Sequence, residues 1–465
     1  MFYYALMNVA FSKIKITPKE FIGKPMAGYS RKDPCLGKLD DIHAYGVLIN
    51  QSDKKANLLI ISVDSLKLPL SIVEYIKNKI ILKHKDLNSD EIIIHATHTH
   101  SSFDLTGEFY YPGGAFGFIK GVMFADNKND RYIVWITNRI TDMVDTLFNN
   151  LEPCKMAWVK KKFNPGIVLN RRWPTRVVLP DLGIIAFRKL TNNSLIGFII
   201  NYACHPTTLS FQNNKLSADF PGRVITKIEE LTNNRSNSIY INGPSGDLNP
   251  ITTSGTNYEE IEKDKTLSYD QYGTYKHTNK IGHIIGEEAL KIADSIPEGI
   301  FFTDIEIDVY KKSVLIPQKD AHYFSKVWFL NSIKWWVKKY FLFKIAKFDK
   351  KFVNFPFFTV ERNHLRKYGR TVVQFITLKT SEGDSYGIIT IPGELFEEIG
   401  KRIIREAPTL EENTLIFQNA QDWIGYLFPL DVYIEEGGYE PFMCFSPLCG
   451  DYIEKNTIEL LKEIK

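Results

Sequence analysis

The amino-acid sequence predicts an α/β fold with a layered mixed sheet, flanking helices and a functional site at the carboxyl ends of the strands. Short apolar segments rich in β-branched residues alternate with longer segments of helical periodicity. Polar loops follow several of the apolar segments directly. Short and nearly continuous apolar runs are typical of strands that are buried on both faces, which indicates a layered architecture with helices outside the sheet.

Six apolar runs are predicted to form strands, and five periodic segments are predicted to form helices. The expected strands cover residues 57–63, 91–95, 196–203, 238–241, 386–391 and 414–418. The expected helices cover residues 69–85, 130–149, 222–231, 282–295 and 394–406. The sequence shows no internal repeat and no low-complexity linker, so we expect a single domain over residues 1–465.

The composition is that of a soluble globular protein with enough apolar material for a large core. Hydrophobic residues make up 44% of the chain, charged residues make up 24%, and the net charge is +4. A charge so close to balance argues against a nucleic-acid partner, which would need a concentrated basic face. The five cysteines are scattered and odd in number, which favours a reducing compartment over a disulfide framework.

The N-terminus and the hydropathy pattern predict neither a signal peptide nor a membrane span. The first residues are apolar, but the segment is short, lacks a basic region and has no clear cleavage site. No uncharged apolar run reaches the roughly 18 residues that a spanning helix needs. We therefore expect a cytoplasmic or peripheral membrane protein.

A basic aromatic insertion is predicted at about residues 320–358. Its central segment, residues 326–351, contains eight lysines, eight aromatic residues and one Asp. Such a segment can lie in a membrane interface or guard a lipid entrance. It can also form a surface helix whose aromatic side chains pack on the protein while the lysine stems extend along it.

Five of the predicted strands end in loops with polar or titratable side chains. These side chains are His98 and His100 after residues 91–95, His205 after 196–203, Asp247 and Asn249 after 238–241, Glu394 after 386–391, and Tyr426 after 414–418. In open α/β sheets, ligands bind just beyond the carboxyl ends of the strands. The recurrence of this pattern therefore predicts one shared site.

His98 and His100 are the first candidates for metal ligands. In an extended chain, residues i and i+2 point to the same face. Both imidazoles can then be ligands, or one can be a ligand and the other a base. Zinc favours histidine nitrogen and carboxylate oxygen, and a catalytic zinc site keeps one position open. The alternative is a hydrogen-bonded pair at a strand end, and a structural role of that kind is what we expect for the nearby His95.

Each of the other candidates also has a structural interpretation when it is taken alone. His205 can be a core or loop histidine, and Tyr426 can be a half-buried tyrosine. Glu394 can be a charge at a helix N-terminus, where the macrodipole favours it, because its Pro-Gly-Glu sequence is expected to open a helix. Asp219 and Asp247 can orient the histidines from behind or can cap loops.

The order and spacing of the motifs resemble the neutral ceramidase family, the zinc amidases that cleave the fatty acyl amide of ceramide. The matching segments cover nearly the whole chain. They are Ile16-Thr17-Pro18 with Pro25-Met26-Ala27-Gly28-Tyr29, Thr97-His98-Thr99-His100-Ser101, Asn170-Arg171, Cys204-His205, Asp219, Pro392-Gly393-Glu394, Gly425-Tyr426, Tyr433 and Gly438-Tyr439-Glu440. The chain looks most similar to short bacterial members with the catalytic domain only, so we expect no C-terminal immunoglobulin-like domain.

The resemblance implies a zinc-dependent amide hydrolase that binds one zinc ion and uses a metal-activated water. The implied metal ligands are His98, His205, Glu394 and Tyr426. His100 would lie beside the water as a base or proton shuttle. Arg171 and Tyr439 would contact the substrate carbonyl or its oxyanion.

Asn249 is a departure from the family pattern. The family loop reads G-D-x-S-P-N, and its serine belongs to the active site, whereas the loop here is Gly246-Asp247-Leu248-Asn249-Pro250. A hydroxyl nucleophile at this position is therefore excluded. Asn249 can still donate hydrogen bonds within the site.

The substrate and even the enzymatic role stay open at the level of sequence. The segment 326–351 favours an N-acyl lipid or glycolipid as substrate. Asn249 and the short C-terminus favour a polar substrate such as an N-acetylated amino sugar. A non-catalytic metal- or lipid-binding protein is a further alternative, although it would not need His100, Arg171 and Tyr439. A Ser/His hydrolase with Ser245 as nucleophile lacks the G-x-S-x-G sequence of a nucleophile elbow.

Overall fold

The computed structural model describes most of the chain. The described residues are 7–29, 31, 33–51, 56–106, 130–252, 272–317, 368–432, 440 and 446–464. Tyr439 and the basic aromatic segment 326–351 lie outside the described residues, as does the greater part of the predicted insertion.

When the two- and three-residue elements are left aside, the described elements follow the order strand, strand, strand, helix, strand, helix three times. The first group comprises β1 (Met7–Lys15), β3 (His43–Gln51), β4 (Ala56–Val63), α1 (Leu70–Lys83), β5 (Ile92–Ala96) and α3 (Asp130–Asn149). The second comprises β6 (Glu152–Lys162), β8 (Asp181–Lys189), β9 (Leu195–Tyr202), α4 (Asp219–Thr232), β11 (Asn237–Asn242) and α6 (Tyr275–Ser295). The third comprises β13 (Glu306–Pro317), β14 (Tyr368–Lys379), β15 (Ser385–Ile391), α8 (Glu397–Arg405), β17 (Thr414–Gln418) and α10 (Cys449–Lys462).

This repeat of topology is not accompanied by a repeat of the sequence. A shared topology requires a similar succession of apolar segments but no shared residues, so it leaves little trace in the sequence. Short elements complete the fold: β2 (Gly37–Lys38), η1 (Ser89–Glu91), β7 (Val168–Asn170), β10 (Lys215–Leu216), β12 (Leu248–Pro250), η2 (Glu298–Ile300), β16 (Glu394–Leu395), η6 (Glu411–Asn413) and β18 (Tyr426–Leu427).

The four long strands of each group pair in the same order. The first two groups form the halves of an eight-stranded sheet with the order β11-β9-β8-β6-β1-β3-β4-β5, and the third forms a four-stranded sheet, β13-β14-β15-β17. The two halves are joined by just two residue pairs between β1 and β6. Each group contains one parallel pair, namely β4–β5, β9–β11 and β15–β17, while its other pairs are antiparallel.

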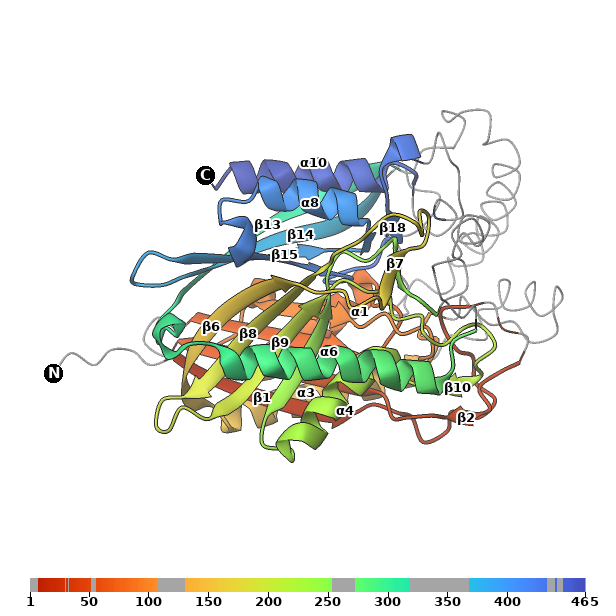
Figure 1. Ribbon diagram of the computed structural model, residues 1–465, viewed down its shortest axis with the longest axis horizontal. Coiled ribbons are helices and arrows are strands. Elements are labelled where there is room, and N and C mark those ends of the chain that lie inside the picture. The colour runs from red at the N-terminus through yellow and green to blue at the C-terminus, as the bar shows by residue number, and fades with distance from the viewer. Residues whose placement is uncertain are drawn as a thin grey trace.

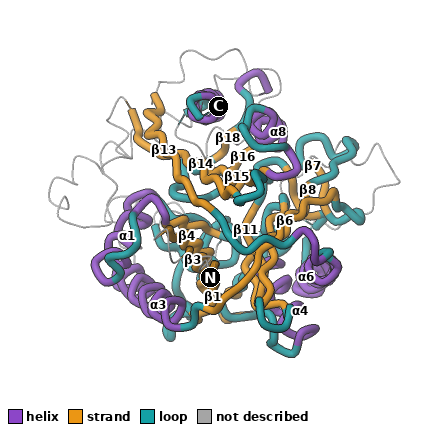
Figure 2. The backbone as a smooth tube through the Cα atoms, turned by 90° about the vertical axis from the view of Figure 1, so that its left-hand side faces the viewer, coloured by secondary structure: helices purple, strands orange, loops and turns teal. Residues whose placement is uncertain are grey.

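The helices lie outside the strands, as the sequence predicts. Figure 1 shows α8 and α10 above the four-stranded sheet, with α4 and α6 on the opposite side of the molecule. In Figure 2, α1 and α3 cover one side of the strands, α4 and α6 cover a second side, and α8 lies over a third. The inner faces of the three groups meet. The Ser62 hydroxyl donates to the Tyr240 carbonyl at 2.8 Å, and the Asn201 side chain donates to the Ile416 carbonyl at 2.9 Å.

Strands buried on both faces explain the continuous apolar runs in the sequence. In β17, Leu415 and Phe417 belong to the central core between the sheets, whereas Ile416 belongs to the core under α8 and α10. In β4, Leu58 and Ile60 face the central core, while the alternate residues pack under α1 and α3. Alternate side chains of a strand point to opposite faces, so every position must be apolar when both faces are covered.

The six predicted strands and five predicted helices all occur, with boundaries shifted by a few residues in most of them. One local expectation was wrong: Glu394 does not open a helix. It lies in β16, and α8 begins at Glu397. The long strands that the sequence did not reveal are β1, β3, β6, β8, β13 and β14. Several carry lysines, as in the end of β6, and so lack a continuous apolar run.

No described helix is both long and apolar enough to cross a membrane.

The packing between the sheets makes a prediction about stability. Phe417 is fully buried in the central core. We expect Phe417→Ala to lower the free energy of unfolding by about 3–5 kcal/mol, because the truncation leaves a cavity between the sheets. Leu410→Ala is the control, since Leu410 is 63% exposed, and its effect should stay within about 0.5 kcal/mol. Denaturant unfolding measures both, and equal effects would contradict the packing described here.

Candidate metal centre

The candidate site lies where the carboxyl ends of the three parallel strand pairs meet. His98 follows β5, His205 follows β9, and Glu394 follows β15. Each of these residues is held by the loop that follows the parallel partner strand, as the following contacts show. The predicted convergence of the strand ends is therefore present for these three residues.

His98 is fixed in both backbone and ring. Its φ of +65° lies in the left-handed region, which histidine enters more readily than most residues. Its amide donates to the carbonyl of Ser65 at 2.9 Å, and its Nδ1 bonds to the carbonyl of Leu66 at 2.6 Å. A carbonyl can only accept, so Nδ1 carries the proton and Nε2 presents a lone pair. Ser65 and Leu66 follow β4, the parallel partner of β5.

His205 is held in the same manner by the loop after β11. Its amide donates to the carbonyl of Leu248 at 2.8 Å, and its Nδ1 donates to the carbonyl of Ser245 at 3.1 Å. Its Nε2 is therefore also the unprotonated nitrogen of the ring. Burial, together with the nearby His98, lowers the pKa of His205 to about 3, so the ring is neutral at physiological pH.

Glu394 is oriented by residues of the loop after β17. Its amide donates to the carbonyl of Gly425 at 3.0 Å, and its Oε1 accepts a hydrogen bond from the indole of Trp423 at 2.9 Å. The ammonium of Lys67 lies 4.3 Å from the centre of the Trp423 ring. Burial by itself would raise the pKa of Glu394, but the histidines and the Tyr426 hydroxyl lower it to about 2. The carboxylate is therefore ionised.

Tyr426 lies beside Glu394, because β16 and β18 pair in parallel with these two residues in register. Its hydroxyl forms a hydrogen bond with the Glu394 carboxylate. Its ring stacks near His205, with 6.4 Å between the ring centres. Burial and the negative charge of Glu394 raise the pKa of the phenol well above its ordinary value.

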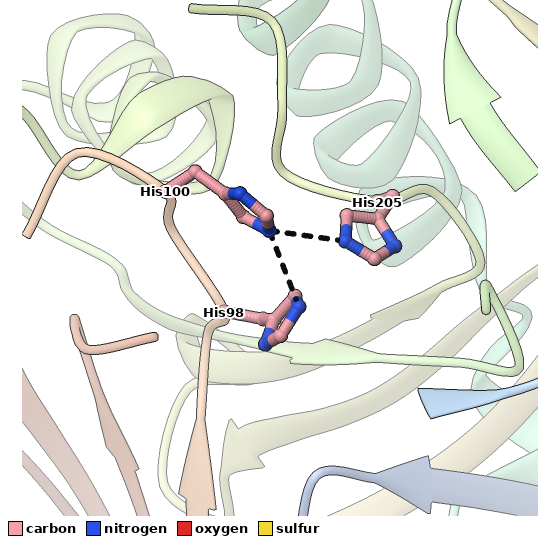
Figure 3. Close-up of side chains that lie close together, drawn as sticks. All are labelled: His98, His100 and His205. Carbon is pink, nitrogen blue, oxygen red and sulfur yellow. Dashed lines mark hydrogen bonds between the residues drawn. The ribbon is translucent and has the colours of Figure 1, made fainter. Parts of the chain in front are cut away.

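Three imidazole nitrogens and one carboxylate oxygen converge at the centre of the site. Figure 3 shows the rings of His98, His100 and His205 turned toward one another. The Nε2 atom of His100 lies 3.3 Å from that of His98 and 3.2 Å from that of His205. Oε2 of Glu394 lies 3.3 Å from His98 Nε2 and 3.7 Å from His205 Nε2. The three buried histidines form a group that could hold a metal ion.

The electrostatics of the cluster agree with that interpretation. Burial and the neighbouring histidines lower the pKa of His100 well below its ordinary value, so its ring is neutral. Oε2 of Glu394 has no hydrogen-bond donor among the described residues, although the atom is buried. A buried, ionised oxygen without a donor is costly unless a cation compensates it. The donor set of nitrogens and carboxylate oxygen is one that divalent metals bind.

Arg171 lies against Tyr426 but is occupied by other partners. Its guanidinium lies 4.9 Å from the centre of the Tyr426 ring. One terminal nitrogen donates to the carbonyl of Gly246 at 2.8 Å and to Glu440 at 3.0 Å. Glu440, which also pairs with Arg172 at 3.1 Å, is a residue whose role the sequence did not suggest. It follows Tyr439, the predicted oxyanion donor, which lies outside the described residues.

Asn249 is buried in β12, opposite Leu169 of β7. The residues just before it, Ser245, Gly246 and Leu248, support the site through their carbonyls, which bond to His205 and Arg171. The hydroxyl of Ser245 accepts a hydrogen bond from Gln418 at 2.6 Å, and its contact with His205 runs through the backbone carbonyl. This arrangement does not support Ser245 as a nucleophile.

The buried aspartates serve the loops and not the histidines. Asp247 accepts from the amide of Glu397 at 2.8 Å and from Asn170 at 2.7 Å, and so stabilises the start of α8. Asp219 accepts from the amides of Leu209 and Phe220. The orienting role behind His98 and His205 is taken by backbone carbonyls instead. The sequence did not identify Trp423 as a residue that orients Glu394. The available signal was its position, three residues before the candidate ligand Tyr426.

His95 has the structural role that the sequence predicts. Its Nδ1 lies 2.9 Å from the hydroxyl of Ser62, and its Nε2 lies 3.1 Å from the side-chain oxygen of Asn242. It therefore links β5 with β4 and β11 and does not join the metal-binding group.

Two solved structures resemble the chain over almost its whole length. One is neutral ceramidase from Pseudomonas aeruginosa, with 15% identity, a TM-score of 0.70, and coverage of 99% of this chain and 75% of that chain. Another is a ceramidase complexed with C2, with 13% identity, a TM-score of 0.72 and the same coverage. No model of a sequence family and no curated protein matches this sequence. The resemblance found in the sequence motifs is thus confirmed at the level of the fold, and the chain has the fold of the neutral ceramidases.

Proposed function

We propose that the protein is a zinc-dependent amide hydrolase of the ceramidase type, which cleaves the N-acyl bond of a lipid. The observation that carries this proposal is the convergence of His98, His100, His205 and Glu394 within a fold shared with two ceramidases. The fold alone would not assign a reaction, because one fold supports many activities. The site supplies the chemical argument.

The distances between the donor atoms support a compact tetrahedral ion such as zinc. Zinc bonds to nitrogen and oxygen of about 2.0–2.2 Å place neighbouring donors roughly 3.3–3.6 Å apart in a tetrahedron. Glu394 Oε2 lies 3.3 Å from His98 Nε2 and 3.7 Å from His205 Nε2. His98, His205 and Glu394 would hold the metal, and the hydroxyl of Tyr426 beside Glu394 would be the fourth ligand. A zinc ion bound there would polarise an amide carbonyl and supply hydroxide at neutral pH.

We assign proton transfer to His100. Its Nε2 lies within 3.3 Å of Nε2 of both His98 and His205, so it would lie next to a water bound between them and the substrate. A neutral imidazole there can accept the proton of the attacking water and return it to the departing amine nitrogen. A positioned general base of this kind contributes about 10²–10⁴ in rate.

Arg171 and Tyr439 are the proposed donors to the oxyanion, and Asn249 is a proposed hydrogen-bond donor to the substrate. The guanidinium of Arg171 is buried against Tyr426. Burial would lower its pKa, but Tyr426 and Glu440 raise it overall, so the charge is retained. One preorganised donor to an oxyanion is typically worth about 3 kcal/mol.

Substitution of the histidines separates the metal ligand from the base. We expect His98→Ala to lose both zinc and activity. His100→Ala should keep about one zinc per chain and lose activity by about 10²–10⁴. His84→Gln is the control, because His84 contacts Asp145 and Phe148 at the far end of α1. Elemental analysis and hydrolysis of a fluorescent short-chain ceramide measure these effects. Loss of zinc from His100→Ala would make His100 a ligand, and full activity of metal-free protein would overturn the proposal.

Trp423 tests the role of the orienting hydrogen bond to Glu394. Trp423→Phe keeps an aromatic ring and removes the indole N–H that holds Oε1. We expect zinc affinity to fall by about 10-fold to 100-fold, as for other residues that orient metal ligands. Trp158→Phe is a matched control, because the indole nitrogen of Trp158 is buried without a hydrogen-bond partner among the described residues. Competition with a chelator of known affinity measures both variants, and equal affinities would contradict this role.

A substrate panel tests the lipid assignment. The panel comprises a short-chain fluorescent ceramide, a second N-acylated lipid and an N-acetylated amino sugar, each with His98→Ala protein as the blank. We expect fatty acid release from the lipids and no acetate release from the sugar. Acetate release alone would keep the chemistry and move the substrate to polar amides. Zinc binding without hydrolysis of any amide would favour a non-catalytic metal-binding protein.

A further inference from the structure

Arg31 is buried next to the site and bonds only to backbone carbonyls among the described residues. Its side chain is 5% exposed. Nε donates to the carbonyl of Asn213 at 2.7 Å, one terminal nitrogen donates to that of Ala27 at 2.8 Å, and the other donates to that of His100 at 2.7 Å. Burial without a carboxylate partner lowers its pKa to about 10. Burial of a cation without a carboxylate partner is unfavourable, which suggests that Arg31 has a specific role at this position.

The ring of His100 lacks the support that fixes the other two histidines. Nδ1 of His98 and Nδ1 of His205 each bond to a backbone carbonyl. Nδ1 of His100 has no partner of normal hydrogen-bond geometry among the described residues, and its one backbone interaction is a weaker hydrogen bond with Gly28, which raises the pKa of the ring. The orientation of this ring therefore depends on the loop of Gly28 and Tyr29, through that contact and through packing.

That packing comes from the loop that Arg31 holds. Gly28 has a φ of +97°, and a β-carbon there would lie 2.6 Å from Cβ and Cγ of His100, so the bare backbone of Gly28 rests directly on the ring. The ring of Tyr29 lies 4.8 Å from that of His100, centre to centre. Arg31 in turn lies 5.1 Å from the Tyr29 ring centre. The guanidinium of Arg31 therefore packs on the ring of Tyr29, which in turn packs on the ring of His100, the proposed base.

The three carbonyls explain why an arginine is needed. They belong to the loop with Gly28, to the chain at His100 itself, and to the loop that follows His205. A planar guanidinium presents donors in three separate directions, whereas a lysine ammonium is a single point charge. Asn213 strengthens the same junction, because its side chain donates to the hydroxyl of Ser101 at 3.0 Å.

We propose that Arg31 is a positioning residue that locks the loop of Gly28 and Tyr29 onto His100 and so aims Nε2 of His100 between His98 and His205. This inference rests on the proposed function, in which His100 transfers the proton. It adds a residue that touches neither the metal ligands nor the reacting atoms and acts only through the base.

The first test compares Arg31→Lys with Arg188→Lys. Arg188 is a matched control, because it is also buried and donates to the carbonyls of Ala293, Asp294 and Ile296, far from the site. Misplacement of a catalytic group by about 1 Å can cost 10²-fold in rate. We expect Arg31→Lys to lower kcat by about 10-fold to 100-fold with zinc content and KM nearly unchanged. Arg188→Lys should lower the melting temperature with kcat unchanged, and equal kcat values for both variants would overturn the proposal.

A double-mutant cycle shows whether Arg31 acts through His100. If it does, Arg31→Lys in the His100→Ala background should cause no further loss of kcat. If the kcat losses of the two single variants multiplied in the double variant, Arg31 would act independently of His100 and the proposal would be overturned.

A third measurement does not depend on activity. Diethyl pyrocarbonate modifies accessible imidazoles. Mass spectrometry of the metal-free protein then measures the rate at which His100 is modified. We expect this rate to rise several-fold in Arg31→Lys and to stay at the wild-type value in Arg188→Lys. An unchanged rate at His100 would overturn the proposal. A raised rate in a protein without amidase activity would keep the clamp on His100 and overturn only the proposed function.

Discussion

The candidate metal centre depends on the burial of three inner strand faces against one another. His98, His205 and Glu394 come from three different groups of strands, and no group can assemble the site alone. The central core between the sheets fixes how the groups lie relative to each other. Close-packed interiors hold such positions to fractions of an ångström, which is the tolerance that the coordination of a metal demands.

Parallel pairing within each group supplies the second constraint. In an antiparallel pair, neighbouring strands end at opposite edges, but the two strands of a parallel pair end together. The loop after one strand can therefore hold the residue after its partner. His98 is held by the carbonyls of Ser65 and Leu66, and His205 by those of Ser245 and Leu248. Backbone carbonyls fix the tautomers of His98 and His205 without adding a charge, and Glu394 supplies a carboxylate beside both rings.

The repeated topology carries a site that is itself asymmetric. In the second and third groups, the loop after the third strand supplies His205 and Glu394. In the first group, the corresponding loop supplies the carbonyls of Ser65 and Leu66, and His98 comes from the end of the fourth strand instead. The two buried arginines near the site also differ in their hydrogen-bond partners. Arg171 is paired with Glu440, whereas Arg31 bonds to carbonyls. Topology thus sets the positions, and the individual residues set the chemistry.

The sequence by itself determined the fold class, the strands buried on both faces and the strand ends that carry His98, His205 and Glu394, because these follow from local periodicity. It could not reveal β1 or β6, whose lysines interrupt the apolar pattern, nor that Glu394 lies in β16 and not in a helix. Only the tertiary structure decided that Trp423 orients Glu394, that Glu440 pairs with Arg171, and that backbone carbonyls and not Asp219 or Asp247 orient the histidines. Such contacts join residues separated by tens to hundreds of positions, and they are set by how the three strand groups pack, which no local pattern encodes.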